Sequence, residues 1–281
     1  MEFAVRHETT YQYPSSVAES FTVVHLQPRT NLRQYCTHYE LSVAPATRIF
    51  SYVDRFGNDV QHFSVIPDHR ELRIVAQSRV VTIAGGPSEI PARVDAAALE
   101  TDPALAELDE FRTDSPYVTV DDAVRSVANA IAAPRGDLAA YFMAAGKYVH
   151  DRFTYHPGLT TVQTTVGETL ESLAGVCQDF AHVLVALGRA RGIPTRYASG
   201  YIHLGGAGVL GADASHAWAE AYLPPYGWVG FDPTNDRVVD DTFVLVALGR
   251  DYGDVSPTRG LYRGRKGSLS VSVAVAGTSD Q

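Results

Sequence analysis

One helical segment constrains the fold most, because it is apolar nearly all the way round. Residues 178–191 read QDFAHVLVALGRAR, and apolar side chains occupy almost every side of the helix from Phe180 to Leu187. A helix with such a surface has to be covered by other elements on all sides. Strand-like runs follow at 195–203, 215–223, 228–232, 242–248 and 269–276. The pattern predicts an α+β unit in which this buried helix packs on an antiparallel sheet.

The first third of the chain has a different composition and is rich in β-branched and aromatic residues. Strand-like segments at 21–26, 39–43, 60–66 and 72–83 are separated by prolines and turn sequences. Spacing of this kind is typical of an all-β sandwich or barrel. A Gly-Gly-Pro sequence at 85–87 marks the change in composition. We therefore expect a sandwich-like β domain over residues 1–90 and the α+β core over residues 91–281.

The overall composition argues against nucleic acid and membranes as partners. The chain has 281 residues, enough for two ordinary domains, and a formal net charge of −9. This acidic balance argues against nucleic acid as a partner. The first residues lack a basic start followed by an apolar stretch, and no run of about 18 apolar residues long enough to cross a membrane occurs. We expect a cytoplasmic protein that does not bind a membrane.

The two cysteines, Cys36 and Cys177, are too few for a disulfide framework or a cysteine-based metal site, and we expect no metal or cofactor. Cys36 lies in a strand-like run and is interpreted as structural. Cys177 directly precedes the buried helix, where unpaired backbone N–H groups and the helix dipole favour a nucleophilic thiolate. The same N–H groups can stabilise an oxyanion. Taken alone, however, Cys177 is better explained as a small buried apolar residue.

A base for this thiol is found in the strand 215–222, which reads SHAWAEAY. Large or polar residues, among them His216, alternate strictly with the alanines at 217, 219 and 221. Successive side chains of a strand point to opposite faces, so the small alanines form one face. We expect that face to pack closely on the buried helix and the other face to carry the imidazole.

The carboxylate that orients such a base is predicted from the register of a hairpin. A short turn joins the strand of His216 to a second strand that ends at Asp232, because Pro233 cannot continue a central ladder. With a five-residue loop, Tyr222 lies opposite Trp228 and Asp232 becomes a diagonal neighbour of His216 on the same face. An even-length loop would place the two side chains on opposite faces.

Several motifs now occur in a characteristic order: GVCQDFA at 175–181, RGIPTRYASGY at 191–201, SHAWAE at 215–220 and GWVGFDPT at 227–234. In this order they resemble the transglutaminase-like superfamily, and residues 1–90 resemble the β domain that precedes the core in its bacterial members. The resemblance implies a papain-like core with a Cys-His-Asp triad. Cys177 would be the nucleophile, His216 the general base and acid, and Asp232 the orienting carboxylate.

Members of this superfamily hydrolyse peptide or amide bonds, or transfer an acyl group to an amine. Our leading hypothesis is a cysteine-dependent amide or peptide hydrolase that acts on a peptide or protein substrate through an acyl-enzyme. The alternatives are a protein-glutamine acyltransferase (a transglutaminase) with an amine acceptor, and a non-catalytic binding protein on the same fold. The Cys177 N–H supplies one oxyanion donor, and Tyr155 and Gln163 are alternatives for the second.

Overall fold

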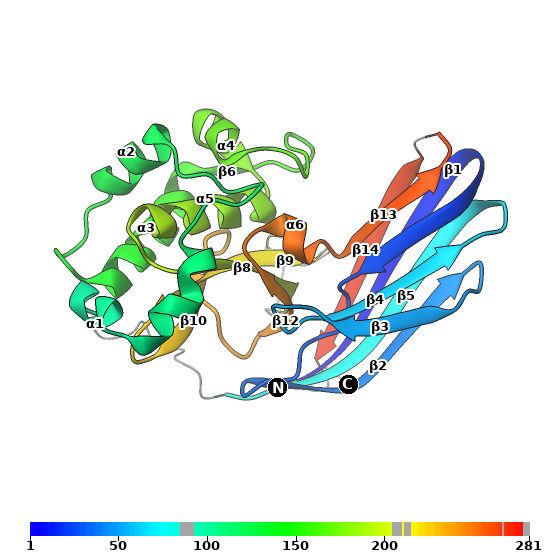
Figure 1. Cartoon of the computed structure of the whole chain (residues 1–281), viewed down its shortest axis with the longest axis horizontal. Coiled ribbons are helices and arrows are strands. Elements are labelled where there is room, and N and C mark those ends of the chain that lie inside the picture. Colours follow the sequence, from blue (N-terminus) through cyan, green and yellow to red (C-terminus); the bar gives the residue numbers. More distant parts are fainter. Residues whose placement is uncertain (85–92, 204–209, 211–214, 266, 278–281) are drawn as a thin grey trace.

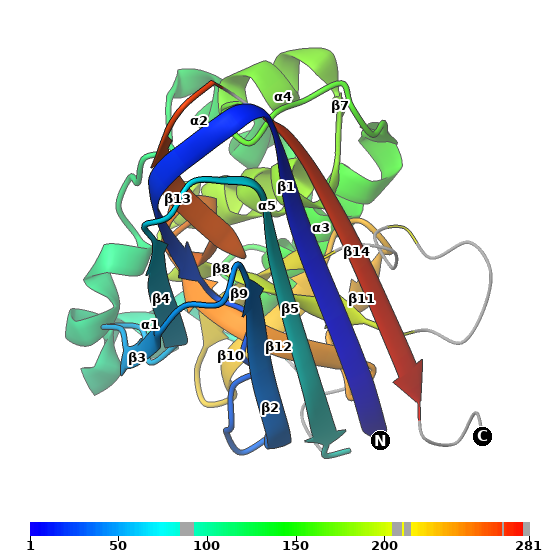
Figure 2. The ribbon, with the colours of Figure 1, turned by 90° about the vertical axis from the view of Figure 1, so that its right-hand side faces the viewer.

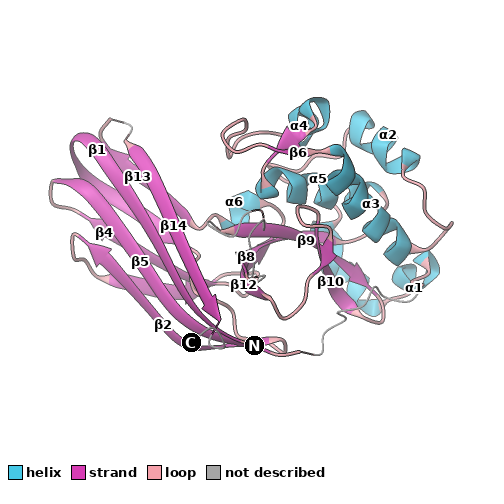
Figure 3. Ribbon diagram, turned by 180° about the vertical axis from the view of Figure 1, so that it is seen from behind, coloured by secondary structure: helices cyan, strands magenta, loops and turns pink. Residues whose placement is uncertain are grey.

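The computed structural model describes residues 1–84, 93–203, 210, 215–265 and 267–277, and it consists of a β sandwich joined to an α+β core (Figures 1 and 3). The sheet of the core lies between its helices and the sandwich. This architecture confirms the predicted fold class. Within the described part of the chain, no helix is both long and apolar enough to span a bilayer.

The sandwich is organised around β1, which is long enough to take part in both of its layers. Its strands are β1 (Glu2–Val24), β2 (Gln34–Ala44), β3 (Ile49–Val53), β4 (Asp59–Val65), β5 (His69–Thr82), β13 (Thr258–Arg263) and β14 (Ser268–Gly277). The first half of β1 pairs with β5 and β14, side by side in Figure 2, and the second half pairs with β4 and β13. Phe63 and Val65 from one layer and Leu72 and Ile74 from the other form the core between them.

The C-terminal strands correct the predicted boundaries, which placed residues 91–281 in the core. β13 and β14 instead pair antiparallel with β1, at the opposite end of the sequence. β4 and β5 cover only one edge of β1, so the returning strands satisfy the N–H and C=O groups of its other edge. The strand expected at 269–276 exists, but it belongs to the sandwich and not to the core sheet.

The core contains one antiparallel sheet and a set of short and medium helices. Its strands follow the order β11-β10-β9-β8-β12 among the described residues. The elements are α1 (Ala96–Glu100), the 3₁₀ helix η1 (Pro103–Phe111), α2 (Asp122–Ala130), α3 (Leu138–Arg152), β6 (Thr154–Tyr155), α4 (Val166–Ser172), β7 (Ala174–Gly175), α5 (Cys177–Ala190), β8 (Thr195–Ile202), β9 (His216–Leu223), β10 (Gly227–Asp232), β11 (Arg237–Val238), β12 (Phe243–Gly249) and α6 (Tyr252–Val255).

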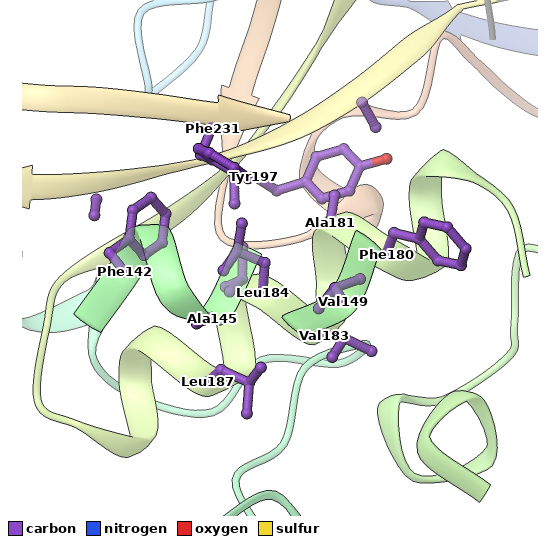
Figure 4. Packing of buried hydrophobic residues seen from close by; sticks show 14 of the residues in the cluster. Phe142, Ala145, Val149, Phe180, Ala181, Val183, Leu184, Leu187, Tyr197 and Phe231 are labelled. Atoms are coloured by element: carbon purple, nitrogen blue, oxygen red, sulfur yellow. The ribbon is translucent and has the colours of Figure 1, made fainter. Parts of the chain in front are cut away.

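The helix α5 is enclosed as its sequence predicts. β9 and β8 cover one side of it, and α2, α3 and α4 cover the others. The three alanines of β9 are buried in the same cluster as the apolar residues of α5, which confirms the predicted packing of the small-residue face. Figure 4 shows Leu184 and Leu187 of α5 beside Phe142 and Ala145 of α3. The start of α5 is therefore held rigidly against the sheet.

Two side-chain amides join the sandwich to β12, a strand at the end of the core sheet. Gln34 accepts from the Leu245 N–H at 2.8 Å and donates to the Leu245 carbonyl at 2.7 Å. Asn58 accepts from the Leu248 N–H and donates to the Leu248 carbonyl, both at 2.8 Å. Each side-chain amide thus makes the two backbone hydrogen bonds that a residue of a neighbouring strand would make with β12. The outer edge of β12 is therefore partly covered.

Candidate active site

The hairpin β9–β10 brings His216 and Asp232 together. Tyr222 lies opposite Trp228, as the sequence predicts, and the ladder continues to the pair Ala219 and Phe231. This register makes Asp232, the last residue of β10, a diagonal neighbour of His216, the first residue of β9. The His216 Nε2 and the Asp232 Oδ2 are 2.8 Å apart, and neither side chain is exposed. The predicted base and carboxylate therefore form a buried hydrogen-bonded pair.

The turn after β10 fixes the Asp232 carboxylate. The Thr234 N–H donates to Oδ1 at 2.9 Å, and the Asn235 side-chain amide donates to Oδ2 at 2.8 Å. Burial alone would raise the pKa of Asp232, but His216 and these donors outweigh it and lower the pKa below its usual value. Sequence reasoning missed Asn235. The signal was available, since an Asp three residues before an Asn in a turn commonly accepts from local donors.

Cys177 opens α5 and faces the strand that carries the imidazole. Its Sγ contacts the carbonyl of Ser215, the residue before His216, at 4.0 Å. The carboxylate of Asp179 accepts from the Val176 N–H at 2.8 Å and from the Thr160 hydroxyl at 2.7 Å, and so caps the first turn. The nucleophile candidate is thus fixed by the helix on one side and by the β9 segment on the other.

The charge on His216 depends on its two neighbours. Burial by itself would lower the pKa of this imidazole, but Asp232 and then Cys177 oppose it, and together they raise the pKa to about 10. In the described part of the chain, Nδ1 is buried and has no hydrogen-bond partner. The Cys177 side chain also interacts with the imidazole. The arrangement stabilises an imidazolium at neutral pH beside the thiol.

Of the two alternatives for a second oxyanion donor, Tyr155 interacts electrostatically with Cys177 and Asp232. Burial raises the pKa of Tyr155 to about 12, and the charge of Cys177 adds to this rise. Its hydroxyl therefore stays protonated at neutral pH. Gln163 is exposed, on the loop that contacts the first turn of α5 through the Val162 carbonyl. Cys36 is half-buried in β2 and donates to the His38 carbonyl.

The described residues contain no cluster of three or more His, Cys, Asp or Glu side chains that would hold a metal ion. The three groups of the candidate site are a thiol, an imidazole and a carboxylate. Groups of these three types, in this order of contact, can support nucleophilic acyl chemistry without a cofactor.

Comparison with known proteins places this chain in a family. Residues 125–233 match the model of the transglutaminase-like superfamily, and residues 3–81 match the bacterial transglutaminase-like N-terminal region. The chain belongs to the transglutaminase-like superfamily and carries the N-terminal region of its bacterial members. The three residues of the candidate site all lie within the first of these matches.

Two curated relatives match this chain over nearly its whole length. Uncharacterized protein ML0607 from Mycobacterium leprae is 35% identical over 274 residues, which cover 96% of each chain. Uncharacterized protein Rv2569c from Mycobacterium tuberculosis is 35% identical over 288 residues, covering 97% of this chain and 91% of the relative. A solved structure from Cytophaga hutchinsonii, described as a candidate cysteine protease, has a TM-score of 0.79 at 24% identity and covers 99% of this chain and 91% of its own. The fold is therefore shared along both parts of the chain.

Proposed function

We propose that the protein is a cysteine-dependent amide or peptide hydrolase of the transglutaminase-like superfamily, with Cys177 as the nucleophile. The buried contact of 2.8 Å between His216 and Asp232, beside the sulfur at the start of α5, carries this proposal. It resembles the arrangement in which a nucleophile, a base and an orienting group act in sequence. The substrate class is a peptide or protein amide, and the cytoplasm is the proposed location.

The reaction follows from the position of each group. The Cys177 thiolate attacks the amide carbonyl carbon, and the negative charge moves to the carbonyl oxygen. The Cys177 N–H is the proposed first donor to this oxygen, and Tyr155 or Gln163 is proposed as the second. The His216 imidazolium then gives its proton to the departing amine as the C–N bond breaks, which leaves a thioester. His216 next takes a proton from water, and the resulting hydroxide displaces the sulfur and releases the acid. Asp232 keeps the imidazole oriented and stabilises its charged form.

An activated acyl-peptide p-nitrophenyl ester tests the proposal directly. We expect a burst of nitrophenol, an acyl adduct on Cys177 by mass spectrometry, and release of that adduct in water. Cys177→Ala abolishes the burst, whereas the matched variant Cys36→Ala keeps it, because Cys36 lies in β2 of the sandwich.

The two alternative functions, acyl transfer to an amine and non-catalytic binding, predict different results in the same assay. If the adduct is stable in water and only a primary amine discharges it, the protein is an acyltransferase and the preference for hydrolysis is wrong. If Cys177 forms no adduct with any acyl donor and reacts with iodoacetamide independently of His216, the protein is a non-catalytic binding protein.

A further inference from the structure

The side chain of Asn235 makes a contact that the three-residue site does not account for. Its Nδ2 donates at 2.8 Å to Asp232 Oδ2, the same oxygen that meets His216 Nε2. Its backbone N–H also points toward Asp232, at 3.4 Å from Oδ1. Asn235 is therefore joined to Asp232 through both its side chain and its main chain.

A second pair of contacts fixes which way the amide points. Asn235 Oδ1 accepts from the Leu210 N–H at 3.3 Å, and Nδ2 donates to the Leu210 carbonyl at 3.3 Å. Turning the amide over would place Oδ1 against both Asp232 Oδ2 and the Leu210 carbonyl, and the NH₂ group against the Leu210 N–H, which are three like-with-like contacts. The hydrogen-bond pattern thus permits only the orientation in which Asn235 donates to Asp232.

We propose that Asn235 is a positioning residue of the site, which holds the Asp232 carboxylate in its ionised form and directs Oδ2 at the imidazole. This inference rests on the proposed function, because it acts through Asp232 on His216. Each oxygen of the carboxylate has its own donor: the Thr234 N–H on Oδ1, and the Asn235 amide on Oδ2 beside His216. Without the Asn235 amide, the His216 imidazole is the one remaining hydrogen-bond partner of Asp232 Oδ2 among the described residues. Fewer hydrogen bonds then oppose rotation of the carboxylate.

The competing explanation is that Asn235 merely fills the turn after β10, and substitutions at this position separate the two roles. Asn235→Asp keeps the shape of the side chain but replaces the donor by a second carboxylate next to Asp232. Asn235→Ala removes the donor without adding charge. If the donor matters, Asp is the worse substitution, since like charges disfavour ionisation of both groups. If shape alone matters, Asp is the milder substitution.

The experiment measures the rate of Cys177 alkylation by iodoacetamide in the full-length chain between pH 4 and pH 9, with Cys36→Ser in every variant. We expect Asn235→Ala to lower the rate at pH 7 about tenfold, which is the effect of one hydrogen bond to a charged group. The acid side of the pH profile moves upward by about one unit, because loss of the donor raises the pKa of Asp232. His216 and Tyr155 also interact with the Asp232 charge and are unchanged in these variants.

Controls distinguish failure of this inference from failure of the proposed function. Asn129→Asp adds the same charge on the exposed part of α2, where Asn129 accepts from Arg191, and should leave the profile unchanged. If His216→Ala does not slow alkylation, the proposed function fails. If His216→Ala slows alkylation but Asn235→Asp matches the parent chain, or both Asn235 variants keep the acid side in place, then the positioning role is wrong and the proposed function stands.

Discussion

Gly200 offers a sharp test of how tightly the site is built into the sheet. It lies on β8 directly opposite His216, in a part of the sheet where there is no room for a side chain. A Cβ atom at this position would lie 2.0 Å from the Val244 carbonyl oxygen of β12 and 2.8 Å from the Trp218 ring. The first of these neighbours is backbone and cannot rotate away. Gly200→Ala should therefore force β8 and β12 apart.

The size of the effect follows from what has to move. Ordinary contacts begin near 3.4 Å, so β12 must shift by more than 1 Å or lose its pairing with β8 around Leu245. Overpacking of this kind costs roughly 1–3 kcal/mol, and loss of two backbone hydrogen bonds adds about 1 kcal/mol each. We expect the free energy of unfolding to fall by roughly 3–5 kcal/mol, and the thermal midpoint to fall by about 10 °C.

Urea denaturation followed by tryptophan fluorescence measures this change, because Trp218 contacts the altered site. Gly167→Ala is the matched control. Gly167 lies in α4, and a Cβ atom there meets only the Asp121 carboxylate at 3.9 Å, so the substitution should be neutral or stabilise the helix by up to about 1 kcal/mol. The reasoning is refuted if Gly200→Ala unfolds within 1 kcal/mol of the unsubstituted chain.

Three further predictions concern buried charge. Burial lowers the pKa of His7 and of His182 from 6.5 to about 4. Between pH 6.5 and pH 4 only the unfolded chain therefore takes up protons at these histidines, and the free energy of unfolding decreases as the pH is lowered. Between pH 7 and pH 5, the free energy of unfolding of His7→Gln should decrease by about 2 kcal/mol less than that of the parent, as denaturation at the two pH values would show. Arg196→Met leaves the Glu220 carboxylate, 2.6 Å from Arg196 in the parent, buried and unpaired. It should destabilise the chain by about 3–5 kcal/mol in urea titrations, and addition of Glu220→Gln should restore most of that loss. Asp232→Asn should slow formation of the acyl adduct by about 10²–10⁴-fold in stopped-flow burst assays, and a decrease below tenfold would contradict its orienting role.

The sequence was most informative where the determinants are local. The burial of α5 follows from its uninterrupted apolar surface, and the contact between His216 and Asp232 follows from a hairpin whose register depends on a short turn. Cys177 at the start of α5 was found in the same way, from the boundary of one helix. Each of these features needs only the period of a helix or a strand and the length of one loop.

Features that depend on distant parts of the chain were not predictable. The pairing of β13 and β14 with β1 joins residues more than 230 positions apart, and a strand sequence alone does not specify its partner. The donor from Asn235 to Asp232 is local, but its orientation is set by Leu210, which reaches it from the segment between β8 and β9. Side-chain amides that substitute for a strand, such as Gln34 on β12, are likewise visible only in three dimensions.

The return of the chain to β1 has a consequence for any attempt to divide this protein. Because β13 and β14 follow the core in sequence but belong to the sandwich, the core is an insertion whose two ends both enter the sandwich. If residues 91–281 were expressed by themselves, β13 and β14 would lack β1, the strand with which they pair. Their unpaired edges would be exposed and prone to aggregation. A recombinant core would need to end near residue 257. A recombinant sandwich would need a linker that joins the end of β5 to the start of β13, so the two modules have to be treated as a nested pair.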